Sequence, residues 1–374
     1  MRHAVIAGYA RSPFHLAHKG QMTKIRPDDM VAQVVKGLLE RTAIKGEDIE
    51  DLICGCAFPE GEQGFNIARL AVFLSGLPNS VGGSTINRWC GSSMQAVHIA
   101  AGNIALGAGD AFICAGIESM SRIPMMGFNP MPNPKLFSDN PNSLMGMGDT
   151  AEVVAKKYAI SREEQEAFAV NSQQKASKAR DNGLFADEIV TIDGVSEDGC
   201  IRADTTAVGL STLKPAFDVA GTVTAGTSSP LTDGASAVLV CSEEYAQQNS
   251  IKPLARIIAV ATSGCAPEIM GMGPVGATKK ALKRAGLTID DIDIIELNEA
   301  FSSQAIACIR ELGIDPSKVN IDGGAIALGH PLGATGARIV GKVASLLQRE
   351  GKRYGLATQC VGGGQGIATI VEVI

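Results

Sequence analysis

Residues 36–58 read KGLLERTAIKGEDIEDLICGCAF, and the same order of residue types returns at residues 279–301 as KKALKRAGLTIDDIDIIELNEAF. The offset is constant, because 279 − 36 and 301 − 58 both equal 243. Identical residues at this offset are Lys36/Lys279, Leu39/Leu282, Arg41/Arg284, Asp48/Asp291, Ile49/Ile292, Ala57/Ala300 and Phe58/Phe301. The alternative is chance similarity between two amphipathic helices that each precede a strand, and the gapless register disfavours it. We therefore predict two similar halves that pack together.

Hydrophobic periodicity around the first segment assigns the elements. Apolar residues recur at helical spacing as Met30, Val31, Val34, Val35, Leu38 and Leu39. A short apolar strand follows at residues 51–58, and helix and strand signals alternate elsewhere, which favours an α/β fold. The same offset places Cys90 opposite Gly333, each near a helix start, and strand 112–116 opposite 355–359. Equivalent loops of the two halves are thus expected to converge on one site.

The material between the halves has no counterpart. Residues 122–149 are rich in Pro, Met and Asn and predict an extended loop, whereas residues 150–182 favour helices, with a capping box from Ser161 to Glu164. Short strands and turns are expected over residues 185–232. We predict an N-terminal half over residues 1–250, with an insertion at about 118–232 that covers a cleft, and a C-terminal half over 251–374.

Composition excludes several classes of protein. The chain has 374 residues, 45 % of them hydrophobic, and a formal net charge of −6, which disfavours a nucleic-acid-binding surface. An odd count of nine scattered cysteines argues against a secreted disulfide framework. No metal site is expected, because the five histidines and the cysteines lack zinc-ligand spacing. The polar N-terminus and the absence of a long apolar run predict neither signal peptide nor membrane span, and a cytoplasmic location.

Cys90 is the first candidate for chemistry. It lies in Asn87-Arg-Trp-Cys-Gly-Ser-Ser93, directly before a helix rich in small residues. A helix N-terminus favours a thiolate over a thiol, and the thiolate is the nucleophile. A buried structural cysteine is the alternative.

Two further segments supply a base and an amide. His330 lies in the glycine-rich run 323–336, before Pro331, where a rigid turn suits general base work or an oxyanion contact. Asn298 opens Asn-Glu-Ala-Phe301 at the carboxyl end of an apolar strand, where α/β sites form. A surface or capping role is the alternative for His330, and a helix cap for Asn298.

Cys360 begins Cys-Val-Gly-Gly-Gly-Gln-Gly366 at the end of another strand, and a core cysteine is the alternative reading. A hydrolase needs one nucleophile, one base and an orienting acid. A second thiol therefore indicates a second proton transfer, at carbon or at a thiol.

Together the four segments resemble the thiolase family over nearly the whole chain. The resemblance implies a thiolase-like α/β fold, with two βαβαβαββ-type halves stacked as α/β/α/β/α layers and an inserted loop domain that binds coenzyme A. It implies thiolytic cleavage of 3-ketoacyl-CoA to acetyl-CoA and a shortened acyl-CoA, reversible as a Claisen condensation. Coenzyme A is then a substrate, and no tightly bound cofactor is expected.

The resemblance also implies roles for individual residues. Cys90 would carry the acyl group, and His330 would activate it and, with a water held by Asn298, stabilise the enolate oxygen. Cys360 would be the acid/base, and the N–H groups of Cys90 and Gly362 would form a second oxyanion hole. Coenzyme A contacts would come from Arg202, Phe217, Ser229, Met147 and Phe301. For Arg202, a solvated surface charge is an equal alternative.

The subtype and the assembly follow from the same resemblance. Gly146-Met-Gly148 stands where biosynthetic acetoacetyl-CoA thiolases carry His-Met-Gly, so a degradative 3-ketoacyl-CoA thiolase of β-oxidation is favoured. The alternatives are a biosynthetic thiolase, a ketoacyl synthase-like condensing enzyme, which typically uses one Cys with two His, and a carrier without turnover. A homodimer or homotetramer is expected, with a partner β-oxidation subunit as a further possibility.

Overall fold

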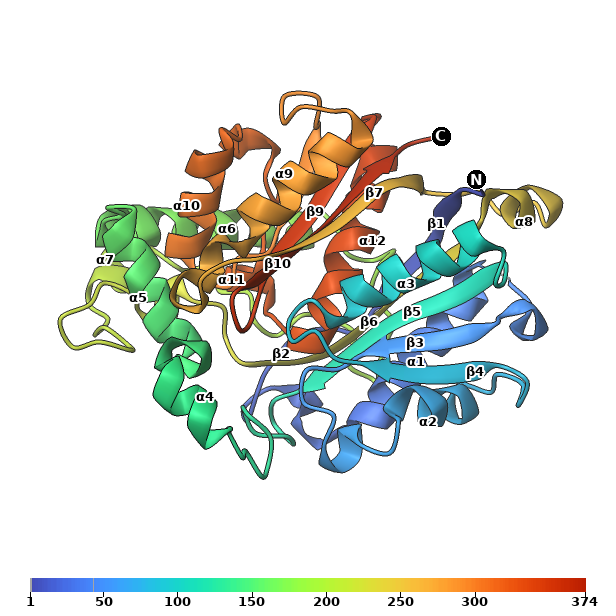
Figure 1. Cartoon of the computed structure of the whole chain (residues 1–374), viewed down its shortest axis with the longest axis horizontal. Coiled ribbons are helices and arrows are strands. Elements are labelled where there is room, and N and C mark those ends of the chain that lie inside the picture. The colour runs from blue at the N-terminus through green and yellow to red at the C-terminus, as the bar shows by residue number, and fades with distance from the viewer. Residues whose placement is uncertain (1, 43) are drawn as a thin grey trace.

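The computed structural model describes residues 2–42 and 44–374, and its strands form two groups that face each other across buried helices (Figure 1). The elements of the first group are β1 (Ala4–Arg11), β2 (His15–Leu16), α1 (Pro27–Thr42), β3 (Asp51–Gly55), α2 (Ile67–Leu74), β4 (Gly82–Ile86), α3 (Ser92–Leu106), β5 (Ala111–Ser119), β6 (Thr232–Ser242) and α8 (Glu243–Gln248). Apart from the short β2, their order from β1 to β6 is the expected βαβαβαββ.

The second group has the same order of elements, except that its counterpart of β4 is reduced. Its elements are β7 (Ala255–Gly264), α9 (Gly273–Ala285), β8 (Ile294–Leu297), α10 (Ser302–Leu312), α11 (Ala325–Leu328), α12 (Leu332–Glu350), β9 (Tyr354–Val361) and β10 (Gln365–Glu372). The counterpart of β4 is a single parallel bridge between Val319 and Ile295. Positions 243 apart fall in β3 and β8 and in β5 and β9, as the repeat predicts.

Hydrogen bonds join the strands in the order β4-β3-β5-β6-β1-β7-β10-β9-β8, with β2 paired to β6. The junction between the groups is narrow, because β1 and β7 pair only at Val5↔Arg256 and Ile6↔Ala255. Each group therefore behaves as its own sheet, and the two meet along one short edge.

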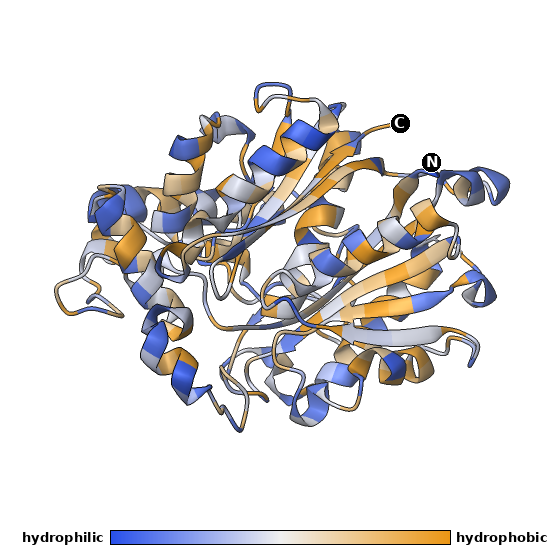
Figure 2. Ribbon diagram, viewed as in Figure 1, coloured by the Kyte–Doolittle hydropathy of each residue, from blue (hydrophilic) through white to orange (hydrophobic). Residues whose placement is uncertain are grey.

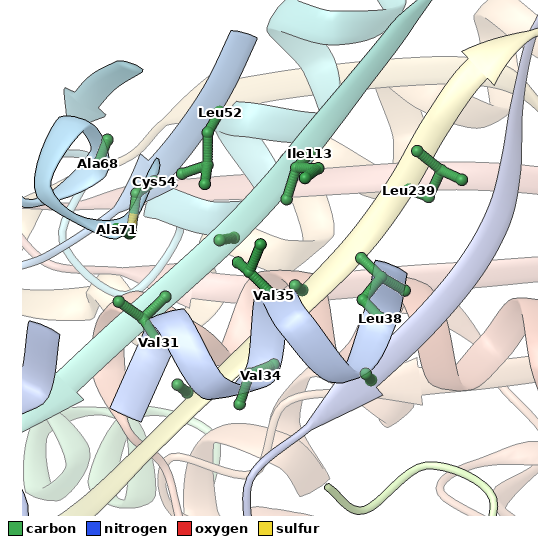
Figure 3. Close-up of a cluster of buried hydrophobic side chains, with 14 of the residues drawn as sticks. Val31, Val34, Val35, Leu38, Leu52, Cys54, Ala68, Ala71, Ile113 and Leu239 are labelled. Atoms are coloured by element: carbon green, nitrogen blue, oxygen red, sulfur yellow. The ribbon is translucent and has the colours of Figure 1, made fainter. Parts of the chain in front are cut away.

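Three apolar clusters fill the layered core, one at each of its three helical layers. One lies between α1, α2 and the first sheet, one surrounds α3 and α12 between the sheets, and one lies under α9 and α10. Figure 3 shows the first, where Val31, Val35 and Leu38 of α1 lie on the side of the helix that faces strand residues such as Ile113 and Leu239. Apolar residues likewise gather in the strands in Figure 2. The predicted α/β/α/β/α layering is thus confirmed.

Glycines allow α3 and α12 to cross closely at their N-terminal ends. A Cβ at Gly336 would lie 2.2 Å from the Met94 nitrogen, and one at Gly333 would lie 2.4 Å from the Ile117 carbonyl oxygen. Such contacts exclude any side chain at these positions. The Ser93 hydroxyl also accepts a hydrogen bond from the Ala337 nitrogen at 2.9 Å. The segments that precede both helices, with Cys90 and His330, are therefore brought to the same end of the central layer.

The segment between β5 and β6 contains the remaining helices, α4 (Pro134–Asp139), α5 (Met147–Lys157), α6 (Arg162–Asp181) and α7 (Ala207–Ser211). The capping box at Ser161 and Glu164 is present at the start of α6, as predicted. The extended loop expected over 122–149 is only partly correct, because α4 and the start of α5 fall within it. In Figure 1 these helices lie at one side of the two sheets.

Candidate active site

Cys90 occupies a tight turn between β4 and α3. Gly91 is the N-cap of α3, and Trp89, directly before the cysteine, has a φ of +46°. The Asn87 side chain accepts a hydrogen bond from the Trp89 nitrogen at 2.8 Å, and the Ser92 hydroxyl donates to the Trp89 carbonyl at 2.6 Å. Positive φ is strained for a bulky residue. The turn is therefore fixed by side chains on both sides of Cys90.

The structure corrects the expectation of a resting thiolate at Cys90. Burial raises the pKa of this thiol to about 12, and the negative charge of Glu118 adds to that effect. Hydrogen bonds from the backbone N–H groups of Gly362 and Cys90 itself lower the pKa, but they do not offset the loss of water. A pKa of about 12 favours the thiol at neutral pH, so Cys90 would need a base to act as a nucleophile.

His330 is a neutral imidazole. Its side chain is 5 % exposed, and burial, followed by the charge of Arg338, lowers its pKa to about 3. Nδ1 lies 2.6 Å from the Thr335 hydroxyl, which donates to the Pro331 carbonyl at 3.0 Å. The Thr335 oxygen therefore accepts from Nδ1–H, and the lone pair of the ring lies on Nε2.

Asn298 follows β8 and reaches the same imidazole. Its backbone N–H donates to the Thr358 carbonyl at 3.0 Å, and Nδ2 lies 3.4 Å from His330 Nε2. The helix-cap alternative is wrong, because α10 begins at Ser302 with Phe301 as its N-cap. Asn298 Oδ1 is buried and has no hydrogen-bond partner among the described residues. An acceptor left in this state suits a water or a ligand donor.

Cys360 lies inside β9, one residue before its end, and is 1 % exposed. Burial raises the pKa of this thiol well above its ordinary range, and the next contribution is the charge of Cys90. The neighbouring Gln359 hydrogen-bonds the Cys90 carbonyl oxygen through its side-chain amide. The segments that contain the two thiols are therefore in contact, although 270 residues separate Cys90 from Cys360 (360 − 90).

Four of the five residues predicted to contact coenzyme A lie around this site. Met147 and Phe301 pack in one apolar cluster with Cys360, and the ring of Phe217 lies 5.9 Å from that of Phe301, edge to face. The Ser229 nitrogen donates to the Ala300 carbonyl at 2.9 Å. Arg202 is exposed, and its backbone N–H donates to the Gln173 side chain at 2.7 Å, so no contact ties it to this group.

Sequence reasoning missed the residues that hold the site residues in place. Thr335, Gln359 and Glu118 were not singled out, although Thr335 lies in the same glycine-rich run as His330. Within residues 2–42 and 44–374, no group of three or more His, Cys, Asp or Glu is arranged to hold a metal ion. No described helix has the length and apolarity to cross a membrane.

The comparisons with known proteins agree with this fold. The family models of the thiolase N-terminal and C-terminal domains match residues 4–244 and 251–373. The chain is 48 % identical over 390 residues to a 3-ketoacyl-CoA thiolase of Bacillus subtilis, and 47 % identical over 387 residues to one of Aliivibrio fischeri. Each alignment covers 100 % of both proteins.

Two stacked α/β halves with a cysteine site between them define the class of protein, an α/β acyltransferase. The chain belongs to the thiolase family. Its activity is thiolytic acyl transfer.

Removing the Thr335 hydroxyl is expected to impair catalysis without unfolding the protein. Thr335→Val deletes the acceptor that keeps the proton on Nδ1 of His330, so Nε2 no longer presents its lone pair. We expect kcat to fall about 100-fold, within the usual range for general base catalysis. Thr335→Ser keeps the hydroxyl and should retain most of the activity. Equal kcat values for the two variants would contradict the assigned tautomer.

Acid is expected to destabilise the fold through two histidines whose pKa values are lowered in the folded protein. The pKa values of His330 and His98 are both lowered to about 3, chiefly by burial, so the unfolded chain binds protons that the folded chain does not. Stability is therefore full above the ordinary pKa of 6.5 and is lost as the pH falls below it. Each histidine should cost about 2 kcal/mol at pH 5 relative to pH 8. Urea unfolding at both pH values measures this loss, and His330→Asn should show a smaller one.

Proposed function

We propose that the protein is a degradative 3-ketoacyl-CoA thiolase that cleaves its substrate with coenzyme A through an acyl-Cys90 intermediate. The observation that carries the proposal is that the segments of two thiols, Cys90 and Cys360, meet at the Gln359–Cys90 hydrogen bond, while Asn298 reaches the His330 ring. The Cys90 thiol would hold the acyl group and the Cys360 thiol would transfer a proton to or from carbon. Hydrolysis does not need a second thiol.

In the first half-reaction, His330 Nε2 accepts the Cys90 proton as the sulfur attacks the 3-keto carbon. The C2–C3 bond breaks, and its electron pair forms the enolate of acetyl-CoA. The Cys360 thiol protonates C2, and acetyl-CoA leaves. The imidazolium is unfavourable at rest, because the pKa of His330 is about 3, so it forms only while a negative charge balances it, first on the substrate oxygen and then on the Cys360 thiolate.

In the second half-reaction, the Cys360 thiolate takes the proton of coenzyme A, and the new thiolate attacks the acyl-Cys90 carbonyl. The Cys90 sulfur leaves and recovers its proton from His330, which restores all three groups. The N–H groups of Cys90 and Gly362, which lower the pKa of the Cys90 thiol, are proposed to bind the thioester oxygen. Donors of this type are each worth about 2.7–4 kcal/mol. Asn298 Oδ1, which is buried and has no hydrogen-bond partner among the described residues, would hold a water that stabilises the enolate oxygen.

We propose that coenzyme A binds where Met147, Phe217, Ser229 and Phe301 gather, and that it is a substrate rather than a resident cofactor. Phe217 is 45 % exposed beside the buried Phe301, which is the placement of a ring that a ligand can cover. Arg202 is proposed to contact the nucleotide, with its exposure as the supporting observation.

We also propose halves at residues 1–250 and 251–374, with the insertion at about 118–232. The two family matches, which end at 244 and begin at 251, support this division. Association into a homodimer or homotetramer is proposed through β4, which ends the strand order and whose residues are all partly exposed. Such edges favour pairing with another chain. Sedimentation equilibrium tests this, and a monomer at micromolar concentration would contradict it.

A cytoplasmic role in β-oxidation, with or without a partner subunit, completes the proposal, since thiolysis shortens an acyl chain. The decisive assay follows the loss of absorbance of the magnesium-bound 3-ketoacyl-CoA enolate in the presence of coenzyme A. We expect turnover, and kcat/KM over short to long chains gives the length preference. No turnover at any chain length would overturn the proposed function.

A further inference from the structure

Glu118 is a fully buried carboxylate that the proposed reaction steps do not use. It lies near the end of β5, is 0 % exposed, and accepts hydrogen bonds from two parts of the chain. Its Oε2 accepts from the nitrogens of Ala57 at 2.8 Å and Gly333 at 2.9 Å. Its Oε1 accepts from the Phe58 nitrogen at 3.2 Å and from Gln63 Nε2 at 2.8 Å. The Cys56 thiol also donates to Oε1, at 3.8 Å. Four N–H donors and one thiol around a single carboxylate indicate that the fold is arranged to hold Glu118, because a buried charge is tolerated only when it is fully hydrogen-bonded.

The Ala57 contact leads to the nucleophile. The Ala57 carbonyl accepts a hydrogen bond from the Asn87 side-chain amide at 2.9 Å. The same Asn87 side chain accepts from the Trp89 nitrogen at 2.8 Å, one residue before Cys90. The Asn87 side chain therefore links the Ala57–Phe58 turn to the Cys90 turn, and a movement of the first turn would displace the second.

The Gly333 contact leads to the base. Gly333 lies in the first turn of α12, three residues after His330, and a carboxylate is stabilised there by the helix dipole. At the other end of this segment a second buried carboxylate, Glu299, accepts from the Ile326 nitrogen at 3.2 Å. The segment that contains His330 is therefore held by one buried carboxylate on each side, and of these two carboxylates only Glu118 belongs to the first half of the chain. The His330 nitrogen itself donates to the Thr232 hydroxyl of the first half at 3.0 Å.

We infer that Glu118 is a positioning residue for acyl transfer, whose carboxylate fixes the Cys90 turn and the His330 turn relative to each other. The inference rests on the proposed function. The charge of Glu118 also raises the pKa of the Cys90 thiol, next after burial among the effects that raise it, so the carboxylate helps keep the nucleophile protonated until substrate arrives.

The first test is Glu118→Gln, which keeps the shape but leaves only one oxygen for the four donors. We expect kcat for thiolysis to fall about 100-fold, as misplacement of reacting groups by about 1 Å does, with little change in KM for coenzyme A. Glu62→Gln is the matched control, because Glu62 is a partly exposed carboxylate paired with Arg26 and Arg122. A kcat within twofold of the wild type for Glu118→Gln would overturn the inference.

A second readout separates positioning from a merely structural role. Iodoacetamide labelling of Cys90, located by peptide mass spectrometry over a range of pH, reports the thiolate without any turnover. We expect the labelling midpoint of Glu118→Gln to move to lower pH, because a negative charge that opposes the thiolate has been removed. An unchanged midpoint would contradict the inference. This assay also stays informative if the wild type shows no thiolysis, in which case the proposed function fails and the contact between Glu118 and Cys90 is still tested.

Rescue keeps the inference falsifiable if Glu118→Gln folds poorly. The double variant Gln63→Glu with Glu118→Gln exchanges the amide and the carboxylate between the two positions. The side chains at positions 63 and 118 can then still hydrogen-bond to each other. The amide oxygen at position 118 can then accept from Ala57 and Gly333. We expect kcat of this variant to be at least about tenfold higher than that of Glu118→Gln, which is the effect of restoring one charge-assisted hydrogen bond. A folded double variant whose kcat is no higher than that of folded Glu118→Gln would count against the positioning role of Glu118.

Discussion

Cys90→Ser is expected to abolish the acyl-protein adduct and to lower kcat/KM for thiolysis by about 10⁴-fold or more, the scale of losing a nucleophile. Serine keeps the turn, because Asn87 and Ser92 hold it through backbone groups. The hydroxyl is a far weaker nucleophile than a thiol, and the neutral His330 is too weak a base to ionise it. Incubation with radiolabelled acetyl-CoA followed by acid precipitation measures the adduct.

The matched control is Cys265→Ser. Cys90 and Cys265 are the two partly exposed cysteines, and the other seven are buried. Cys265 donates to the Ile269 carbonyl at 3.7 Å, a contact that a serine hydroxyl can also make. We expect this control to acylate and turn over normally. An adduct on Cys90→Ser, or its loss in Cys265→Ser, would refute the assignment of the nucleophile.

Cys360→Ala is expected to separate the two chemical steps of the enzyme. Cys90, His330 and Asn298 remain, so the variant should still accept an acetyl group from acetyl-CoA. It should fail to exchange the acetyl C2 protons with D₂O, because it lacks the thiol that is proposed to move them. Thiolysis should fall about 10³-fold, within the usual range for loss of a general acid–base group. Mass spectrometry of acetyl-CoA recovered from D₂O measures the exchange.

Cys308→Ala is the control for the loss of a buried thiol. Cys308 lies on α10, is 0 % exposed and donates to the Gly271 carbonyl at 3.2 Å. Its removal should lower stability by about 1–3 kcal/mol, the cost of leaving a buried acceptor unpaired, and should leave proton exchange intact. Full exchange in Cys360→Ala would move the acid–base role to another residue.

The internal repeat predicted most of the fold. Segments 36–58 and 279–301 share residues because both bury the same helix face and strand, and that local periodicity is visible in any window of the sequence. The capping box at Ser161 was equally local, since its hydrogen bonds span three residues. The loop predicted over 122–149 failed in part, because proline permits the short helix α4, which has Pro134 at its first position and Asn133 as its cap.

The sequence by itself thus determined the two-half architecture and the four segments that meet at the site, because spacing and residue type are local properties. Only the tertiary structure decided the protonation states, with Cys90 a thiol and His330 neutral, because desolvation depends on which distant segments exclude water. It alone showed Thr335 fixing the imidazole and Glu118 joining the two turns. Glu118 and Gly333 are 215 residues apart, and a hydrogen bond across that separation leaves no periodic trace in the sequence.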